Sequence, residues 1–200
     1  MRTAILSILV LFLCAVTTRG APPKPRPATG KGMLVMRTSA AGGEVVLYRE
    51  PGVGRVAEKP PAKLPLLTHV VESADGDYPT AVLGKRGAWL RIVYDEAERE
   101  GWIEMERPWR YTSWEEFLPG HTVRLLPGLK KGYALLRREP VPSAAGLAPL
   151  SPELTLKVEL VQGDWLRVCF DPKTSGWLRW RDENGRFLVS LPADNGQQKR

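Results

Sequence analysis

The sequence predicts a mainly β protein, built from two tandem small antiparallel barrels with a short helical turn between them. The 200 residues include 18 prolines and 19 glycines, and chain breaks this frequent suit many short strands better than a few long helices. A tryptophan-containing pattern occurs twice, at residues 87–103 and 163–180. Two further segments, residues 34–51 and 123–140, align with each other without a gap. Together these repeats indicate an internal duplication.

The first 20 residues have the layout of a secretory signal peptide. Arg2 supplies a positive charge, and residues 4–16 form an uncharged, mostly apolar run that ends shortly before a cleavage position ahead of Ala21. This run is shorter than the roughly 20 residues that a membrane-spanning helix needs. We therefore expect export to the periplasm or the extracellular space, with no integral membrane span in the mature chain. An uncleaved anchor and lipid attachment at Cys14 are the alternatives.

Charge and cysteine content restrict the function classes. The formal net charge is +7, and removal of a signal peptide containing Arg2 and Arg19 leaves +7 − 2 = +5. This charge favours acidic surfaces, or it simply belongs to a solvated basic surface. No run of Lys or Arg interleaved with aromatic residues resembles a nucleic-acid-binding stripe, and an exported protein rarely meets nucleic acid, so we expect no nucleic-acid partner. Cys169 is the one cysteine of the mature chain, so an intramolecular disulfide is excluded there.

Two segments are expected to lie outside the folded modules. Residues 21–32 form a Pro-rich basic tether, because prolines favour extended polyproline conformations. This tether is either an exposed linker or a ligand for a proline-binding domain. Residues 193–200 are expected to form a flexible tail.

The first module is expected over residues 33–112 and the second over residues 121–192. Each opens with two strands joined by a glycine-containing turn. Both then reach the sequence Leu-x-Arg-Glu-Pro, at residues 47–51 and 136–140, with a constant offset of 89 residues. The predicted strands are residues 33–37, 44–48, 122–126 and 133–136.

A long irregular loop is expected next in both copies, at residues 55–80 and 141–152. The first copy is 13 residues longer in this region. Long loops in compact domains tend to be functional or disordered, but loop insertions are also tolerated because closure entropy grows slowly with length. Both explanations of the insertion stay open.

The repeated tryptophan pattern predicts a strand, a hairpin loop and a returning strand. In the first copy Leu90 and Ile92 alternate with Trp89 and Arg91, which is the period of a half-buried strand. The returning strand has glycine immediately before tryptophan, and this favours a bulge or a close approach of two backbones.

A short helical linker is expected between the modules, over residues 113–120. Ser113 and Glu116 fit a capping box, in which the serine side chain accepts from a backbone N–H and the glutamate reaches back. Pro119 and Gly120 follow, so we expect one helical turn over residues 114–118.

The order of these marks resembles that of the bacterial Src-homology-3-like (SH3b) domains, present twice in tandem. The resemblance rests on Leu-Tyr-Arg-Glu-Pro or Leu-Arg-Arg-Glu-Pro, a long loop, Gly-x-Trp-Leu-Arg-Ile/Val, a hairpin and Gly-Trp-Ile/Leu, and it covers most of residues 33–190. It implies two SH3-like barrels. It also implies a non-catalytic role, since some members hold peptidoglycan peptides and others dock against a partner domain.

Tryptophan is enriched in binding hot spots, and four of the seven tryptophans belong to the repeat. We expect one of each repeated pair to fill a barrel core and the other to line a groove, unless all of them serve core packing. Exposed arginines of the repeat either bind carboxylates or form salt bridges within a module. The candidate ligand groove consists of Tyr48, Arg91, Trp102, Tyr133, Arg167 and Trp177. The tryptophans outside the repeat, expected to hold the modules together, are Trp109, Trp114 and Trp180.

The sequence predicts no catalytic, cofactor-binding or metal-binding residues. Cys169 and a histidine would make a nucleophile and base, but Cys169 lies in an apolar strand and is interpreted as a small buried hydrophobe. One cysteine and two histidines do not give zinc-ligand spacing. Asp75-Gly76-Asp77 lacks the further acidic ligands of a calcium loop.

We therefore expect a non-enzymatic binding or scaffolding protein of the bacterial envelope, without a cofactor. Its expected partner is peptidoglycan or a cell-wall peptide. The alternative is a protein–protein interaction or assembly module of the periplasm, with an envelope protein as the partner and no cell-wall ligand.

Overall fold

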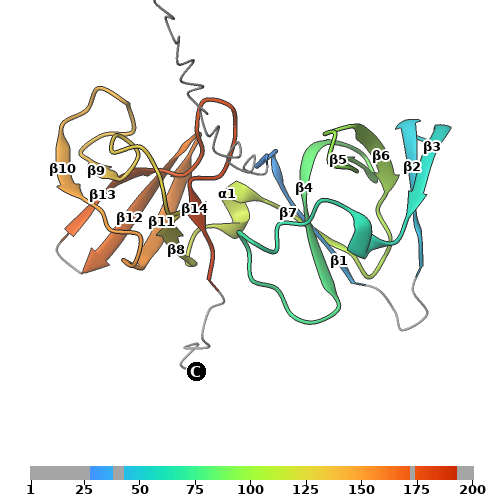
Figure 1. Ribbon diagram of the computed structural model, residues 1–200, viewed down its shortest axis with the longest axis horizontal. Helices are drawn as coiled ribbons and strands as arrows, with labels where there is room; N and C mark the ends of the chain where they lie inside the picture. The colour runs from blue at the N-terminus through green and yellow to red at the C-terminus, as the bar shows by residue number, and fades with distance from the viewer. Residues whose placement is uncertain (1–27, 38–42, 172–173, 193–200) are drawn as a thin grey trace, which may run out of the picture.

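A computed structural model shows two seven-stranded antiparallel sheets that lie side by side (Figure 1). We refer to the part of the chain that carries each sheet as the first and the second unit. The structure describes residues 28–37, 43–171 and 174–192. The predicted signal peptide, most of the predicted tether and the predicted tail lie outside the described residues.

Both sheets have the same strand order. The first sheet consists of β1 (Gly32–Arg37), β2 (Val45–Glu50), β3 (Val53–Lys59), β4 (Asp77–Arg86), β5 (Trp89–Val93), β6 (Glu100–Glu104) and β7 (Arg110–Ser113), in the order β3-β2-β6-β5-β4-β1-β7. The second consists of β8 (Thr122–Leu125), β9 (Leu135–Arg137), β10 (Gly146–Pro149), β11 (Leu156–Gln162), β12 (Trp165–Asp171), β13 (Thr174–Arg179) and β14 (Val189–Ser190), in the order β10-β9-β13-β12-β11-β8-β14. Every strand thus has a counterpart at the same place, which confirms the internal duplication.

The glycine before each returning tryptophan allows a close approach between strands, as predicted. A Cβ atom on Gly101 would lie 3.1 Å from the side chain of Leu47, and one on Gly176 would lie 2.6 Å from that of Leu136. Leu47 and Leu136 occupy corresponding positions of the two copies and are both fully buried. A side chain at either glycine would therefore push a core leucine away.

Neither sheet closes into a barrel within the described residues. The edge strands β3 and β7 each pair on one side only, as do β10 and β14. The prediction of closed barrels is therefore wrong, and each sheet is open. The predicted irregular loops are also wrong in part, because most of β3 and all of β10 lie within them. Backbone hydrogen bonds hold an edge strand in place. Its side chains therefore need not alternate between apolar and polar, and those of β3 are mostly exposed.

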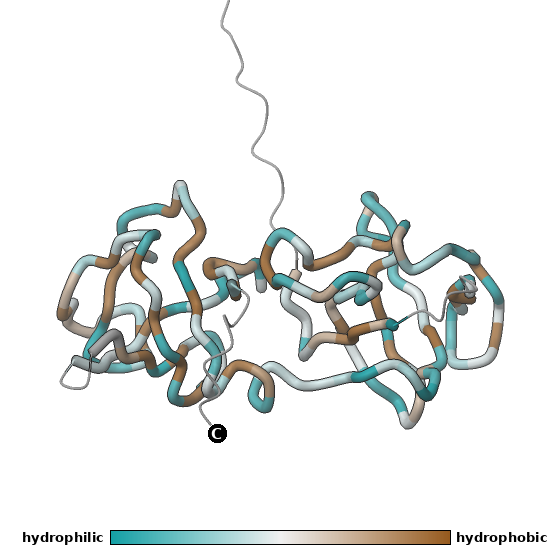
Figure 2. Tube along the Cα trace, turned by 90° about the horizontal axis from the view of Figure 1, so that it is seen from below, coloured by the Kyte–Doolittle hydropathy of each residue, from teal (hydrophilic) through white to brown (hydrophobic). Residues whose placement is uncertain are grey.

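One of the two hydrophobic cores is shared by both units. A first core lies within the first sheet. The second core combines side chains of the second sheet with residues of the first unit, such as Met33 and Leu67. Figure 2 shows apolar segments inside both units and at the boundary between them.

Three aromatic side chains form the centre of the shared core. Trp114 is 1% exposed, and its ring lies edge-on to Trp180 and Phe187 with centroid distances of 5.8 and 5.3 Å. Its indole N–H donates to the carbonyl of Thr29 at 2.6 Å. We call Trp114, Trp180 and Phe187 the aromatic joint. Trp114 and Trp180 thus connect the units as predicted, whereas Trp109 packs in the core of the first sheet and the prediction for it is wrong.

Backbone hydrogen bonds also cross the boundary between the units. The N–H of Thr29 donates to Gly185 at 2.8 Å, and the N–H of Leu191 donates to Val70 at 2.6 Å. The N–H of Glu72 returns a bond to the carbonyl of Leu191 at 3.2 Å. The beginning and the end of the described chain are therefore bound to the opposite unit.

The helical linker has the predicted form. Helix α1 (Trp114–Phe117) is a single turn, and both hydrogen bonds of the Ser113–Glu116 capping box are present. A 3₁₀ turn, η1 (Pro61–Lys63), is the other helical element of the described chain. Within the described residues, no helix has the length and apolar character needed to cross a membrane.

Replacement of Trp114 by alanine is expected to lower the free energy of unfolding of the whole protein by about 3–5 kcal/mol, because a fully buried aromatic side chain is lost. Chemical denaturation followed by circular dichroism measures this change. The unmodified protein should unfold in one cooperative transition, because the core spans both units. Trp177→Ala, which removes a partly exposed ring, is the control and should lower the free energy of unfolding clearly less. Two separate unfolding transitions of the unmodified protein would contradict the shared core.

Candidate functional site

The repeated tryptophans lie on the outer faces of the sheets. Leu90 and Ile103 pair across β5 and β6 and are both fully buried. Side chains alternate along a strand, so the neighbouring Trp89 and Trp102 point to the opposite face. Neither belongs to the core clusters of the described residues. Trp102 and Trp165 are 7% and 8% exposed, so one tryptophan of each pair is buried, as predicted, although neither belongs to a core cluster of the described chain.

The three predicted groove residues of the first unit come together in one cross-strand row. Tyr48 pairs with Trp102, which pairs with Arg91. The Trp102 ring is only 7% exposed, because the guanidinium groups of Arg86 and Arg91 lie 5.0 and 5.9 Å from its centroid. Arg91 also forms a salt bridge of 3.1 Å with Glu100. The arginines cover the ring, so this row is not an open groove.

The predicted groove residues of the second unit are divided between two places. Arg167 and Trp177 are cross-strand neighbours, and Arg167 forms a salt bridge of 3.0 Å with Glu159 on β11. Tyr133 lies at the pocket described next, which neither Arg167 nor Trp177 lines. The six predicted residues therefore do not form a single groove, and ligand binding by them stays a prediction.

An open pocket of about 290 Å³ lies on the second unit. It combines two aromatic rings with three cationic side chains, beside the loop that precedes β10. Its lining residues are Lys130, Gly132, Tyr133, Leu135, Arg137, Pro142, Trp165, Arg179 and Glu183. We call it the aromatic–arginine pocket.

Arg179 is held in place from several sides. Its side chain is 13% exposed and ion-pairs with Glu183, while its Nε donates to the carbonyl of Arg181 at 3.0 Å. The guanidinium carbon lies 5.9 Å from the ring centroids of both Tyr133 and Trp165. A fixed guanidinium between two aromatic rings is a suitable partner for a planar carboxylate.

The other two cationic side chains of the pocket, Arg137 and Lys130, differ in whether they already have a hydrogen-bond partner. Arg137 donates to the carbonyl of Ala144 at 2.8 Å, and this bond ties the loop before β10 to the pocket. The Lys130 ammonium makes no hydrogen bond or ion pair with the rest of the described chain. Lys130 is therefore the pocket cation that an anionic ligand engages without breaking an existing contact.

A hydrogen bond fixes one wall of the pocket. The Tyr133 hydroxyl donates to the Glu183 carboxylate at 2.6 Å. This bond lowers the pKa of Glu183 below its ordinary value and, together with burial, raises the pKa of Tyr133. Glu183 thus stays ionised at neutral pH and holds Tyr133 and Arg179 together.

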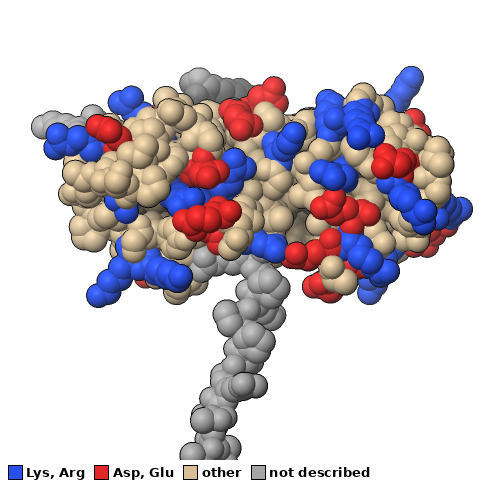
Figure 3. Space-filling model, turned by 90° about the horizontal axis from the view of Figure 1, so that it is seen from above, with Lys and Arg blue, Asp and Glu red and all other residues tan. Residues whose placement is uncertain are grey.

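The corresponding region of the first unit has the opposite charge. A pocket of about 240 Å³ there carries Glu44, Glu104 and Glu106 beside Trp109. Glu104 is the cross-strand partner of Trp89, as Arg179 is of Trp165. Figure 3 shows that acidic and basic side chains are interspersed over the visible face of both units, without one continuous basic patch. The two copies are therefore not equivalent as binding sites.

Sequence analysis missed Trp165, Arg137 and Arg179 as pocket residues. The signal for two of them was present, because the repeat pairs β12 with β13 and so places Trp165 opposite Arg179. Arg91 and Arg167 use carboxylates of neighbouring strands, as expected for salt bridges within a module.

The residues with possible catalytic or metal chemistry remain apart. Cys169 is half-buried, so its interpretation as a buried hydrophobe is only partly right; its position faces Ser175 and Lys157 on neighbouring strands. Asp77 pairs with Arg37 at 2.8 Å. Among the residues that the structure describes, no group of three or more His, Cys, Asp or Glu side chains is placed to hold a metal ion.

No protein-family model matches the chain, and no curated protein matches it. The choice of the aromatic–arginine pocket as the candidate site therefore rests on its geometry.

Tyr133→Phe is expected to raise the pKa of Glu183 towards the ordinary glutamate value of about 4.3, because the hydroxyl donor is lost. The contribution of this bond to stability is complete above that value and is lost as the pH falls through the lower pKa of the folded protein. A carboxyl-carbon NMR titration measures the shift. An unchanged Glu183 midpoint in the variant would show that the bond is not formed.

Proposed function

We propose that the protein is an exported, non-enzymatic binding and scaffolding protein of the bacterial envelope, built from two SH3-like units. Each unit is then an opened SH3-like barrel whose edge strands do not meet. The repeated strand order supports this proposal, as does the signal-peptide layout of the first 20 residues.

The aromatic–arginine pocket is proposed to bind a carboxylate of a peptidoglycan peptide. The single observation that carries this assignment is the convergence of Tyr133, Trp165 and Arg179 at an open pocket. Cell-wall stem peptides carry several free carboxylates on short flexible chains. An arginine that is already fixed in position loses little conformational entropy when it binds such a group.

The alternative function, an assembly module without a cell-wall ligand, is favoured by the exposed edge strands. Val53 and Val56 on β3 are 67% and 39% exposed, and Leu147 on β10 is 43% exposed. Open edges with apolar side chains accept an added strand from a partner protein. In this case the two units would present separate edges for assembly with an envelope protein.

Titration calorimetry at low salt with a purified stem peptide tests the first function. We expect binding, and about tenfold weaker binding of the same peptide with its carboxylates amidated, since one charge-assisted contact is worth about 1.4 kcal/mol. Trp165→Ala should weaken binding by about tenfold, because stacking is lost. Trp89→Ala, the corresponding change in the first unit, should leave the affinity unchanged.

Two outcomes decide between the functions. Absence of binding at low salt by the folded, unmodified protein would exclude the cell-wall version. Recovery of one envelope protein by crosslinking, lost when Val53→Lys or Leu147→Lys charges an edge strand, would support the assembly module instead.

A further inference from the structure

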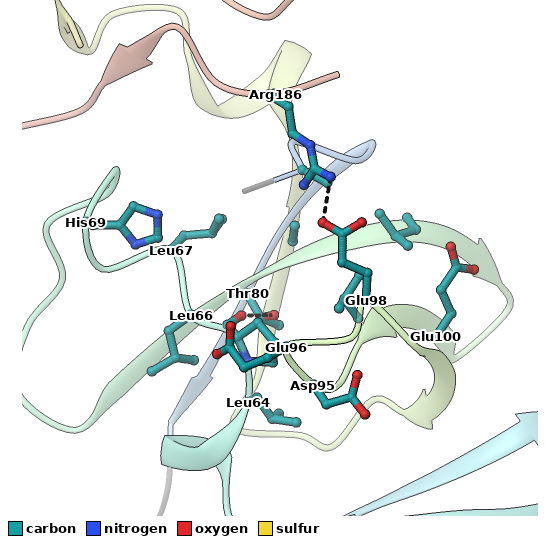
Figure 4. A pocket seen from close by; sticks show the side chains of 15 residues that line it. Leu64, Leu66, Leu67, His69, Thr80, Asp95, Glu96, Glu98, Glu100 and Arg186 are labelled. Carbon is teal, nitrogen blue, oxygen red and sulfur yellow. Dashed lines mark hydrogen bonds and ion pairs between the residues drawn. The ribbon is translucent and has the colours of Figure 1, made fainter. Parts of the chain in front are cut away.

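A second pocket lies where the two units meet, and the proposed function does not use it. Its volume is about 440 Å³, within the usual range for ligand sites. The first unit supplies most of its lining, Arg186 of the second unit closes one side, and Ala28 also borders it (Figure 4). We call it the joint pocket, because it exists only while the units are held together.

The floor of the joint pocket is apolar and well supported. Leu64 and Leu67 are 5% and 1% exposed. Thr80 donates its hydroxyl hydrogen to the carbonyl of Pro65 at 3.0 Å, and the N–H of Leu67 donates to the carbonyl of Pro79 at 2.8 Å. This floor belongs to the region in which the first copy is longer than the second, so part of the insertion has a defined place in the fold.

The hairpin between β5 and β6 forms an acidic wall, but most of its carboxylates are already paired. Asp95 accepts from the N–H groups of Ala97 and Arg99 at 3.1 Å and forms a salt bridge with Arg99. Glu98 is bonded to Arg186 at 2.5 Å. These contacts fix the shape of the wall and tie it to the second unit.

Glu96 is the exception on this wall. Its carboxylate has no hydrogen-bond or ion-pair partner within the described chain. In Figure 4 its side chain lies beside Thr80 and the floor residues Leu64 and Leu66. An unpaired carboxylate next to a supported apolar surface matches a side chain with an apolar stem and a cationic end, which is the chemistry of lysine and arginine.

We propose that the joint pocket binds a basic segment of a partner protein. One lysine or arginine of that segment places its alkyl stem on Leu64 and Leu66 and its cationic group at Glu96. Of the four carboxylates in the lining, those of Asp95, Glu98 and Glu100 are paired with arginines, which leaves Glu96 as the contact for a cation. This interaction is separate from the aromatic–arginine pocket and does not require the function proposed for it.

Fluorescence anisotropy of a labelled Ala-Leu-Lys-Leu-Lys-Ala peptide on the full mature protein tests this site, with Ala-Leu-Glu-Leu-Glu-Ala as the matched acidic probe. We expect the basic peptide to bind and the acidic one not to bind. Glu96→Gln should weaken binding about five- to tenfold, because one charge-assisted hydrogen bond is lost. Leu66→Ser should weaken it as well, because the alkyl stem loses its apolar contact. Glu106→Gln, at the acidic pocket of the first sheet, is the matched control and should change nothing.

Each contrary outcome overturns the proposal. Equal affinities of the unmodified protein and Glu96→Gln would show that this carboxylate is not the contact. Equal losses in Glu96→Gln and Glu106→Gln would show general attraction to acidic surface. Binding of lysine amide as tight as that of the peptide would identify a small amine as the ligand. Trp165→Ala should retain peptide binding, which separates this result from that for the aromatic–arginine pocket.

Discussion

The burial of one indole ring determines how the rest of the molecule is arranged. Trp114 lies between the units, packs edge-on against Trp180 and Phe187, and donates its N–H to the carbonyl of Thr29. A buried indole N–H without a partner would be costly, so the strand that begins the first sheet has to come to this ring. The shared core then fixes both sheets at one boundary, and the joint pocket forms along it.

The two copies have kept their inner faces and changed their outer ones. Corresponding inner positions such as Leu47 and Leu136 are apolar and buried, because a small core tolerates few changes of volume or polarity. On the outer face the cross-strand partner of the first repeated tryptophan is Glu104 in one copy and Arg179 in the other. Such positions change charge at little cost in stability. The two copies therefore share one strand order but carry pockets of different charge.

Local patterns in the sequence predicted the parts of the fold that depend on near neighbours. The capping box predicted α1, and the alternation around Leu90 predicted the inner face of β5. The same alternation, applied to Trp102 beside Ile103, places that ring outside the core. The edge strands β3 and β10 were not predicted, because backbone pairing holds them and their side chains carry no clear alternation of apolar and polar residues. The joint pocket could not be predicted, since the Glu98–Arg186 contact joins residues 88 positions apart and no local pattern encodes it.

The bonds between the two ends of the described chain also bear on the order in which its parts fold. Thr29 is bonded to Gly185, and Val70 to Leu191, so the boundary of the first unit is completed by residues more than 100 positions later in the chain. Without the second unit, Met33 and Leu67 lack a large part of the core that buries them. Contacts between residues so far apart in the sequence form late in folding, because closing the loop between them costs entropy, so we expect the sheet of the first unit to form before the boundary between the units.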